Sequence, residues 1–259
     1  MTVGRCRRTA RLPSSSSAPS DADVFNPRPR IDAIAVTPQQ TCWVVDDALL
    51  EPDRLVEFAV AERPRFDDAP HNAYPGPELR LPEAFVQAFE RWFSLHLRDR
   101  VGLRRVQRAT ARLSLTTRSP ASLQPRQSIC HVDAFDLQPG QRIAATVLYL
   151  FDDPALGGTS FYMPRRPLED IAVLLRDSAA MTSDAFEARY GIAPGYMVES
   201  NAWFQRVGTA PPRYNRLIAY SGTMFHSGDI RRPELLRDDP RTGRLSVNGF
   251  FIGSRPFGS

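Results

Sequence analysis

The first part of the chain combines short strand patterns with two amphipathic helices. Residues 31–36 and 41–46 are short, mainly apolar runs that predict strands. Glu51-Pro52-Asp53 is typical of a helix start, and apolar residues at helical spacing continue to about residue 62. A second helix is predicted from Leu81, and its aromatic stripe indicates a face that packs on a core. That stripe consists of Phe85, Phe89, Trp92, Phe93 and Leu97.

The second part of the chain is mostly short strands separated by turns. A long stretch, 164–212, reads as irregular apart from a helix predicted at 168–176. Many short strands behind two packed helices favour a mainly β fold with flanking helices, a double-stranded β-helix (jelly roll, cupin-like). The predicted strands are 112–117, 143–150, 159–163, 216–220, 222–226 and 244–252.

The N-terminal residues differ in amino-acid composition from the rest of the chain. Residues 1–30 are rich in Ser, Pro and Arg and are predicted to form a disordered tail. Residues 31–259 are expected to form one jelly-roll domain, with a helical buttress at 31–104 and a metal-binding core at 105–253. Residues 1–30 lack the apolar stretch of a secretory signal peptide, so a cytoplasmic protein is expected.

Charge gives little support for a nucleic-acid partner. All 33 basic residues are arginines, and with 29 acidic residues the net charge is +4. The arginines that precede the first acidic residue, Asp21, account for this excess, and the remainder of the chain is neutral. Nucleic-acid binding is therefore not expected. No apolar run is long enough for a membrane span, so no membrane partner is expected; the oligomeric state is left open.

Cysteine usage argues against a disulfide framework. Cys6, Cys42 and Cys130 are far apart, odd in number and form no CxxC pair. This pattern disfavours a cysteine zinc site and is typical of a reducing compartment. Cys130, next to a histidine of interest, is expected to be a buried and unreactive thiol.

The chemistry-bearing pattern begins at His131-Val132-Asp133. Residues i and i+2 of an extended segment point to the same side, so His131 and Asp133 can face one metal ion. An HxD pair alone is a weak signal. It gains weight from the motifs later in the chain, which are an apolar strand at 144–150, a Gly-Gly-Thr turn at 157–159, a second histidine, His226, and an arginine, Arg244, at the head of a final apolar strand.

In this order of motifs the sequence resembles the iron(II)- and 2-oxoglutarate-dependent dioxygenases, in particular the prolyl-hydroxylase-like branch and a bacterial group of unassigned activity within it. The resemblance covers about residues 105–253. It implies that His131, Asp133 and His226 are the catalytic metal ligands, that Fe(II), 2-oxoglutarate and O2 are the cofactors, and that succinate and CO2 are released. Two histidines and a carboxylate also leave the open positions that non-haem Fe(II) oxygenases use. Because the carboxylate is present, a hydroxylase is expected rather than a halogenase.

The same resemblance assigns residues to 2-oxoglutarate. Some relatives hold its distal carboxylate with a lysine, but this chain has none. Arg244 resembles the anchoring arginine of the family, and a guanidinium can hold a carboxylate through two parallel hydrogen bonds. Arg241 is the alternative, although it reads as part of a turn. Tyr149 and Asn248 are further cofactor-binding candidates, while Thr159 is expected to stabilise its turn.

Other functions stay open at the level of sequence. The main alternative is a non-catalytic metal-binding jelly roll that acts as a sensor or scaffold. A zinc hydrolase with the same three ligands and a nucleic-acid repair oxygenase are two more. The substrate is expected to be a small metabolite, an amino acid or a peptide side chain. Residues 165–212, with Tyr190, Tyr196, Trp203 and Phe204, either form a wall of the site or pack as a connection.

Overall fold

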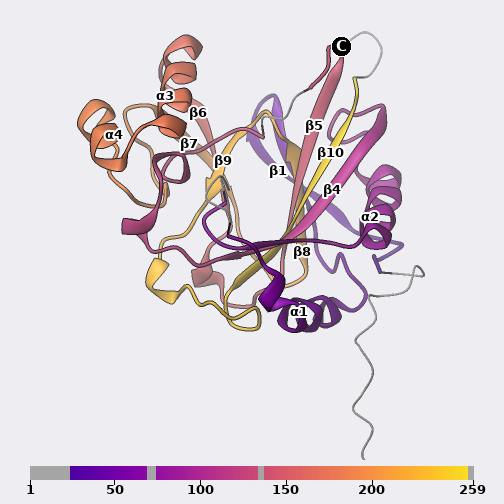
Figure 1. Cartoon of the computed structure of the whole chain (residues 1–259). Coiled ribbons are helices and arrows are strands. Elements are labelled where there is room, and N and C mark those ends of the chain that lie inside the picture. The colour runs from indigo at the N-terminus through magenta and orange to yellow at the C-terminus, as the bar shows by residue number, and fades with distance from the viewer. Residues whose placement is uncertain (1–23, 69–73, 134–136, 256–259) are drawn as a thin grey trace, which may run out of the picture.

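In the computed structural model the described residues are 24–68, 74–133 and 137–255. Within them the chain forms ten strands and four α-helices (Figure 1). The strands are β1 (Ile31–Thr37), β2 (Gln40–Val45), β3 (Glu78–Arg80), β4 (Arg105–Thr116), β5 (Gln141–Tyr149), β6 (Thr159–Pro164), β7 (Phe204–Ala210), β8 (Arg216–Ser221), β9 (Phe225–Gly228) and β10 (Arg244–Ser254). The helices are α1 (Pro52–Ala61), α2 (Glu83–His96), α3 (Leu168–Ala180) and α4 (Ser183–Tyr190).

From β4 onward the chain passes between two antiparallel sheets that pack face to face. The larger sheet contains the neighbours β8-β5-β10-β4, and the smaller contains β7-β6-β9. His131 pairs with His226 of β9 through an isolated bridge, which adds a fourth segment to the smaller sheet. Two four-membered layers built in this order are the double-stranded β-helix, so the predicted fold class is confirmed. The hairpin β1-β2 and the short β3 extend the larger sheet at its two edges.

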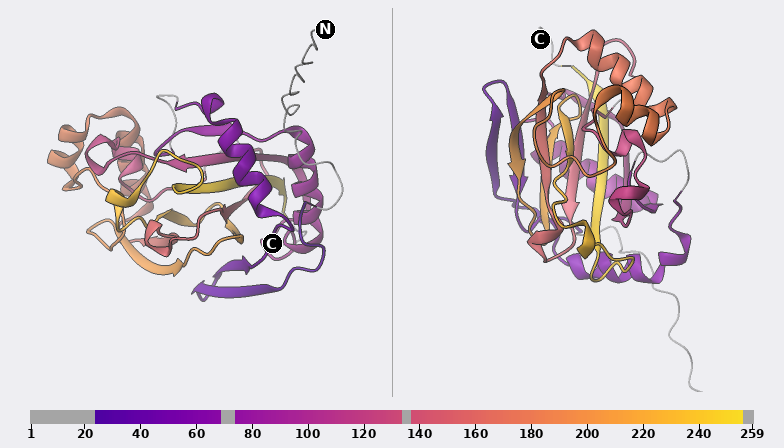
Figure 2. Two further views of the ribbon diagram at one scale, coloured as in Figure 1. Left: turned by 90° about the horizontal axis from the view of Figure 1, so that it is seen from below. Right: turned by 90° about the vertical axis from the view of Figure 1, so that its left-hand side faces the viewer.

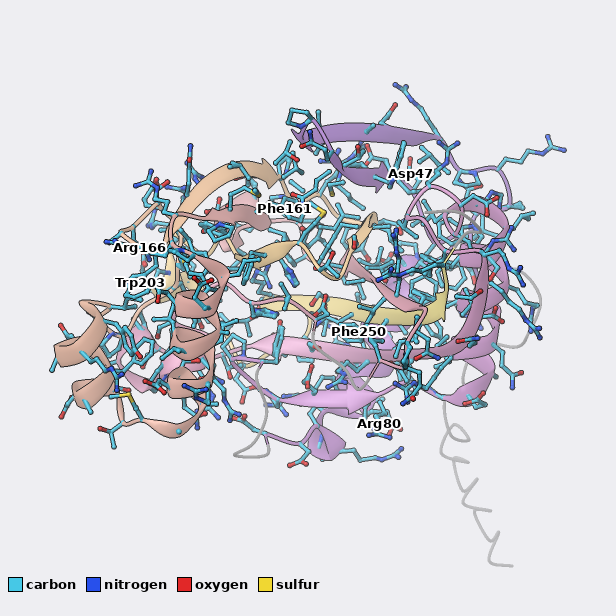
Figure 3. All side chains as sticks on the ribbon, turned by 90° about the horizontal axis from the view of Figure 1, so that it is seen from above. Asp47, Arg80, Phe161, Arg166, Trp203 and Phe250 are labelled. Carbon is cyan, nitrogen blue, oxygen red and sulfur yellow. The ribbon has the colours of Figure 1, made fainter. Side chains whose placement is uncertain are left out.

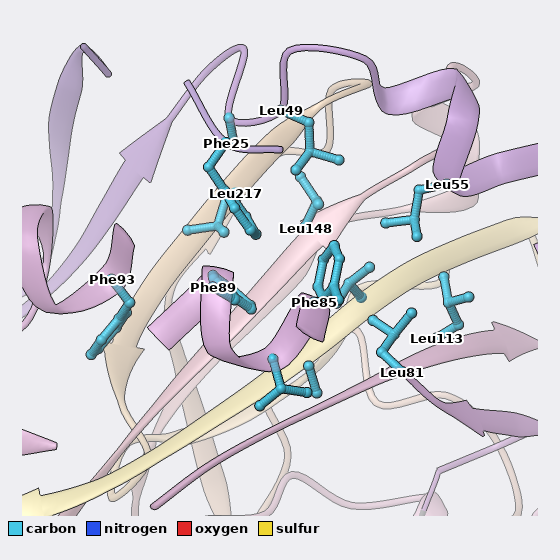
Figure 4. Close-up of a cluster of buried hydrophobic side chains, with 14 of the residues drawn as sticks. Phe25, Leu49, Leu55, Leu81, Phe85, Phe89, Phe93, Leu113, Leu148 and Leu217 are labelled. Atoms are coloured by element: carbon cyan, nitrogen blue, oxygen red, sulfur yellow. The ribbon is translucent and has the colours of Figure 1, made fainter. Parts of the chain in front are cut away.

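Helices α1 and α2 cover the outer face of the larger sheet, and their contacts form the main hydrophobic core (Figures 1 and 4). The predicted aromatic stripe of α2 is buried there. The rings of Phe93 and Phe251 of β10 stack with their centroids 3.7 Å apart, and the ring of Phe89 meets Phe251 edge-on at 5.0 Å. This core lies on the far side of the sheet from the space between the two layers, so it supports the barrel without entering it.

The N-terminal boundary needs a correction. The predicted tail runs to residue 30, but Phe25 is buried and stacks on Phe89 with a centroid distance of 4.8 Å. Its backbone forms a bridge with Leu49. An aromatic residue in a Pro- and Arg-rich stretch gives no periodic pattern, which is why the sequence did not place it in the core. The rest of the predicted tail, residues 1–23, lies outside the described residues.

The stretch predicted as irregular contains more structure than its pattern suggests. The predicted helix exists as α3 and extends to Ala180, and it is followed by α4 and β7. Helix α4 buries only Phe186, and β7 buries only its two end residues, so neither shows a clear apolar period. The two helices project at one end of the sandwich (Figure 2). They pack on the smaller sheet through their own apolar cluster, which includes Leu174, Phe186 and Phe204.

The predicted strand at 222–226 also starts too early. Ser221 to Met224 form a turn, in which the Met224 amide donates to the Ser221 carbonyl at 2.9 Å, and β9 begins at Phe225. None of the helices in the described part of the chain is long and apolar enough to cross a bilayer.

Candidate metal centre

The structure brings His131, Asp133 and His226 together at the inner side of the smaller sheet. One potential ligand atom from each residue lies within 4.8 Å of the others. His226 Nε2 is 3.7 Å from Asp133 Oδ2, and the two imidazole centroids are 4.4 Å apart. These separations suit three donors that surround one ion. Among the described residues this is the one cluster of this kind.

Backbone hydrogen bonds hold this arrangement. The amides of His131 and His226 each donate to the other's carbonyl, at 3.0 and 2.9 Å, so the two histidines sit opposite each other. The Asp133 amide donates to the Gly222 carbonyl at 2.8 Å, which fixes the segment again two residues later. Strand pairing therefore positions His131 and His226, and a backbone hydrogen bond to the turn before β9 positions Asp133.

The imidazole of His226 is oriented for metal binding. Its Nδ1 lies 2.9 Å from the Met224 carbonyl, which can only accept, so we assign the proton to Nδ1. Nε2 then carries the lone pair and faces Asp133. A backbone carbonyl behind a ligating histidine is a common way to fix the tautomer and the ring orientation. The ring of Tyr220 packs edge-on against this imidazole at 4.8 Å.

Asp133 shows that the site fits a cation. Its Oδ2 is buried and accepts no hydrogen bond from any described residue. A buried carboxylate oxygen without a donor is unfavourable, and a bound divalent ion would remove that penalty. Gly222 makes room for the carboxylate, since a Cβ at this position would lie 3.1 Å from Asp133 Cβ and 2.9 Å from Ile143 Cγ2. Two imidazoles and one carboxylate are a donor set suited to Fe(II).

Protonation states at neutral pH also suit metal binding. Burial raises the pKa of Asp133 to about 6, and burial lowers the pKa of His226 to about 4. Burial within the site and then the adjacent His226 also lower the pKa of His131, although this residue keeps an exposed surface in the cavity. Near pH 7 the histidines are neutral and the carboxylate is mainly ionised, which are the forms that bind metal ions.

Acidification is expected to weaken metal binding in two stages. Below about pH 6 a proton competes for Asp133, so the apparent affinity for Co(II) should fall by about tenfold per pH unit. Below about pH 4 protonation of His226 should make the fall steeper. Titration of the apo-protein with Co(II) between pH 7.5 and 3.5, followed by visible absorbance, measures both stages. A constant affinity down to pH 5 would contradict it.

A cavity of about 280 Å³ opens beside the three ligands, between the two sheets. Its walls carry several polar groups. The inner face of β4 provides Arg112 and Thr116, β10 provides Arg244 and Asn248, and Tyr196 closes one side from the 165–212 segment. That segment therefore contributes a wall of the cavity, through Tyr196 alone of the four aromatic residues considered from the sequence.

Arg244 is a buried cation in this cavity. It is 4% exposed, and no described carboxylate lies within ion-pair distance. Its guanidinium donates to three backbone carbonyls, those of Leu156, Gly157 and Gly158, and to Thr116 Oγ1 at 3.3 Å. These four acceptors fix the group but do not neutralise it, and two of its five N–H groups have no partner among them. A buried positive charge of this kind favours an anion.

A gap connects Arg244 with the metal ligands. Gly228 lies two residues after His226 on β9, and a Cβ there would point to the same face and lie 3.7 Å from Arg244 Nη2. Thr159 pairs with Gly228 across β6 and β9 and lines the cavity. The missing side chain at 228 thus leaves a passage from the histidines to the guanidinium.

The other residues considered from the sequence take different places. Tyr149 is fully buried but does not line the cavity, and its hydroxyl pairs with Thr159 Oγ1 at 2.8 Å. Thr159, expected to stabilise its turn, faces the cavity in its place. Asn248 does line the cavity and donates to Ser114 Oγ at 2.9 Å. Arg241 is on the surface, where it pairs with Glu57, so it does not compete with Arg244.

Sequence reasoning missed Arg112, Thr116, Tyr74 and Gly228, all of which line the cavity. A signal existed for two of them, because polar residues alternate with leucines over 112–116. Tyr74 and Gly228 belong to a loop and a short strand that carry no such pattern. Cys130 agrees with the sequence expectation, since it is buried and burial raises the pKa of its thiol.

Comparison with known families gives one decisive match. A family model described as "Family of unknown function (DUF6445)" matches residues 27–251. The chain belongs to this family. No curated protein matches its sequence.

Solved structures with a similar arrangement are distant from this DUF6445 chain in sequence. EvdO2 from Micromonospora carbonacea var. aurantiaca is 11% identical, with a TM-score of 0.43 over 83% of this chain and 87% of that one. A prolyl-4-hydroxylase from Pseudomonas putida is 17% identical, with a TM-score of 0.38 over 84% and 89%. HygX from Streptomyces hygroscopicus, solved with nickel, 2-oxoglutarate and hygromycin B bound, is 12% identical, with a TM-score of 0.42 over 82% of each chain.

Proposed function

We propose that this protein is a non-haem Fe(II)- and 2-oxoglutarate-dependent dioxygenase of the prolyl-hydroxylase-like branch that hydroxylates a small molecule or a peptide side chain. The observation that carries this proposal is the presence of two complementary groups in one cavity. One is the cluster of His131, Asp133 and His226 with its buried, unsatisfied carboxylate oxygen. The other is Arg244, a buried cation with no described acidic partner.

In this function His131, Asp133 and His226 hold Fe(II), and Arg244 holds the distal carboxylate of 2-oxoglutarate. Thr159 stands beside the passage at Gly228 and can donate its hydroxyl to the same carboxylate. When bound, the iron supplies the oxidising chemistry, in which 2-oxoglutarate, O2 and R–H give succinate, CO2 and R–OH. The protein contributes orientation of the co-substrate and exclusion of water from a cavity enclosed by two sheets.

The charges of the site are consistent with this occupancy. A divalent ion and the Arg244 guanidinium contribute three positive charges, and Asp133 contributes one negative charge. The two carboxylates of 2-oxoglutarate complete the neutralisation. Asp133 occupies the position at which a halide would bind in a halogenase, which supports hydroxylation as the outcome.

An anaerobic titration tests the proposal directly. Apo-protein is mixed with Fe(II) and then with 2-oxoglutarate, and the visible charge-transfer band of the chelate is recorded. We expect a band in wild type and none in His226→Ala. Absence of the band in folded wild-type protein would overturn the proposal. A band without succinate formation in the presence of O2 and candidate substrates would favour the alternative, a non-catalytic metal-binding jelly roll.

Filling the passage at Gly228 is expected to weaken the binding of 2-oxoglutarate without changing the binding of the metal ion. Its Cβ would lie 3.7 Å from Arg244 Nη2 and 3.3 Å from Ile230 Cδ1, so the methyl groups of valine would enter the space assigned to 2-oxoglutarate. Gly228→Val should weaken 2-oxoglutarate binding by at least about tenfold, with a smaller effect for Gly228→Ala. Co(II) affinity should stay unchanged in both. Calorimetric titration of each ligand measures the two quantities, and an unaltered 2-oxoglutarate affinity in Gly228→Val would place the co-substrate elsewhere.

A further inference from the structure

A second guanidinium, that of Arg112, faces the same cavity from another side. On β4 the residues Arg112, Ser114 and Thr116 alternate with Leu113 and Leu115, which are fully buried in the helix-covered core. The polar residues therefore point into the sandwich. The side chain of Arg112 is 31% exposed, whereas that of Arg244 is almost completely enclosed. Arg112 is accordingly the more accessible cation of the two.

Arg112 is held in place by an ion pair that uses only part of the hydrogen-bonding capacity of its guanidinium. Its Nη1 donates to Glu78 Oε2 at 2.9 Å, and Glu78 Oε1 accepts from Ser114 Oγ at 2.8 Å. Both oxygens of Glu78 are thus engaged, and its side chain is only 10% exposed. Among the described residues the Arg112 side chain makes this one hydrogen bond, so the N–H groups on Nε and Nη2 stay open. Those two atoms form the edge of a guanidinium that binds a carboxylate in bidentate fashion.

An apolar surface lies beside this guanidinium. Its carbon Cζ is 5.5 Å from the centroid of the ring of Phe250, a half-buried residue that lies near the middle of the view in Figure 3. Ala145 and Val147 line the cavity on the neighbouring strand β5. A ligand that places a carboxylate on Arg112 would therefore lay an apolar body against these side chains.

The strand register separates Arg112 from Arg244. Arg112 is opposite Asn248 on β10, and Thr116 is opposite Arg244, so the two arginines are four residues apart along the ladder, roughly 14 Å. Phe250 shares a row with Ala145 and Tyr220, and the Tyr220 ring touches the imidazole of His226. Arg112 thus lines the same cavity as the three candidate metal ligands but lies away from the passage that leads to Arg244.

We propose that Arg112 binds a carboxylate of the molecule that is oxidised, so that the substrate is a small carboxylic acid with an apolar body. This inference rests on the proposed function, in which Arg244 is already occupied by 2-oxoglutarate. Glu78 is a positioning residue that orients Arg112 through their ion pair. A cavity of about 280 Å³ is slightly smaller than most small-molecule sites, which favours a compact ligand.

Matched acids and amides test this proposal. The protein is loaded anaerobically with Fe(II) and 2-oxoglutarate, and the probes are 4-methylpentanoate, benzoate and N-acetyl-L-leucine, each with its uncharged primary amide. The perturbation of the charge-transfer band on addition of each probe gives an apparent Kd. At least one acid is expected to bind, and its amide should bind at least about 30-fold more weakly because the bidentate pair is lost. Preference for N-acetyl-L-leucine would indicate a peptide C-terminus as the source of the carboxylate, and preference for the others a free acid.

Three variants separate recognition from structural support. Arg112→Gln should weaken acid binding at least about 30-fold and leave the affinity for 2-oxoglutarate unchanged. Glu78→Gln breaks the ion pair but keeps the guanidinium, so it should retain acid binding. Arg108→Gln, a change at an exposed arginine on the same strand, should have no effect. If the pair of Arg112 and Glu78 were purely structural, Arg112→Gln and Glu78→Gln would weaken acid binding to a similar extent.

Several outcomes would overturn the proposal. These are equal binding of acids and amides, no response to any acid, and acid binding that survives in folded Arg112→Gln. Loss of 2-oxoglutarate affinity in Arg112→Gln would instead show that Arg112 is the co-substrate anchor. Failure of the proposed function itself looks different, because wild-type protein would then give no charge-transfer band before any probe is added.

Discussion

Asp133→Asn is expected to give an apo-protein that is more stable than wild type and no longer binds Fe(II) or Co(II) with useful affinity. The ionised carboxylate has a buried oxygen without a donor, and burial raises its pKa from 3.8 to about 6. Because the folded-state pKa lies above the unfolded value, ionisation of Asp133 destabilises the folded apo-protein above about pH 6. The shift corresponds to about 2–3 kcal/mol. The amide carries no charge and removes this cost.

The stability difference between Asp133→Asn and wild type should depend on pH and on metal. It should be largest above about pH 6 and vanish below about pH 4, where the wild-type carboxyl group is protonated in both states. In saturating Co(II) the order should reverse, because the ion stabilises only the protein that binds it. Thermal unfolding of both proteins, with and without Co(II) and at pH 7.5 and pH 4, measures the stability difference under these four conditions. A variant that is less stable than wild-type apo-protein at pH 7.5 would contradict this account of the site.

Arg244→Met is expected to lose 2-oxoglutarate binding and part of the folding stability together. The guanidinium satisfies the carbonyls of residues 156–158 and the Thr116 hydroxyl, all in a buried place. Leaving such acceptors without donors should cost about 2–4 kcal/mol. Removal of the cation at the end of the passage past Gly228 should weaken 2-oxoglutarate binding by at least about 100-fold. Co(II) affinity should change little.

Two further variants make the Arg244 result interpretable. Arg244→Lys keeps a positive charge and should therefore bind 2-oxoglutarate more tightly than Arg244→Met does. It lacks the planar guanidinium that donates to three carbonyls, so its affinity should stay below that of wild type. Arg241→Met removes an exposed arginine paired with Glu57 and should leave stability and both affinities close to wild type. Calorimetric titration and thermal unfolding supply the measurements. Wild-type affinity for 2-oxoglutarate in a folded Arg244→Met variant would show that this arginine is not the anchor.

The sequence predicted the fold where local pattern and tertiary placement agree. The apolar run that became β5 is a central strand of the larger sheet and is buried on both faces, and the stripe of α2 packs on the outer face of the same sheet. Prediction failed where burial comes from distant partners. Phe25 is ordered by the rings of α2, and Phe186 of α4 by the cluster around β7, and neither contact leaves a periodic trace in the local sequence.

For the candidate site, the sequence supplied the residue types but not their partners. The order of motifs was sufficient to select His131, Asp133, His226 and Arg244 for attention. It could not show that Tyr149 stops short of the cavity lining and meets Thr159 instead, because that depends on how β5 and β6 lie across from each other between the two sheets. Nor could it show that Glu78 and Arg112 meet, since β3 pairs with β4 through a register that three residues of sequence do not specify.

The position of β10 has a consequence for how the protein is made. This strand comes after all the other described strands in the chain, yet it lies between β4 and β5 and pairs with both along most of its length. During synthesis β4 and β5 therefore emerge with no partner between them, and the barrel cannot close until residue 254 has left the ribosome. His131 and His226 likewise meet only late in translation. The apolar strands β4 and β5 lack their shared partner until β10 is added, so truncation before β10 should prevent the larger sheet from forming.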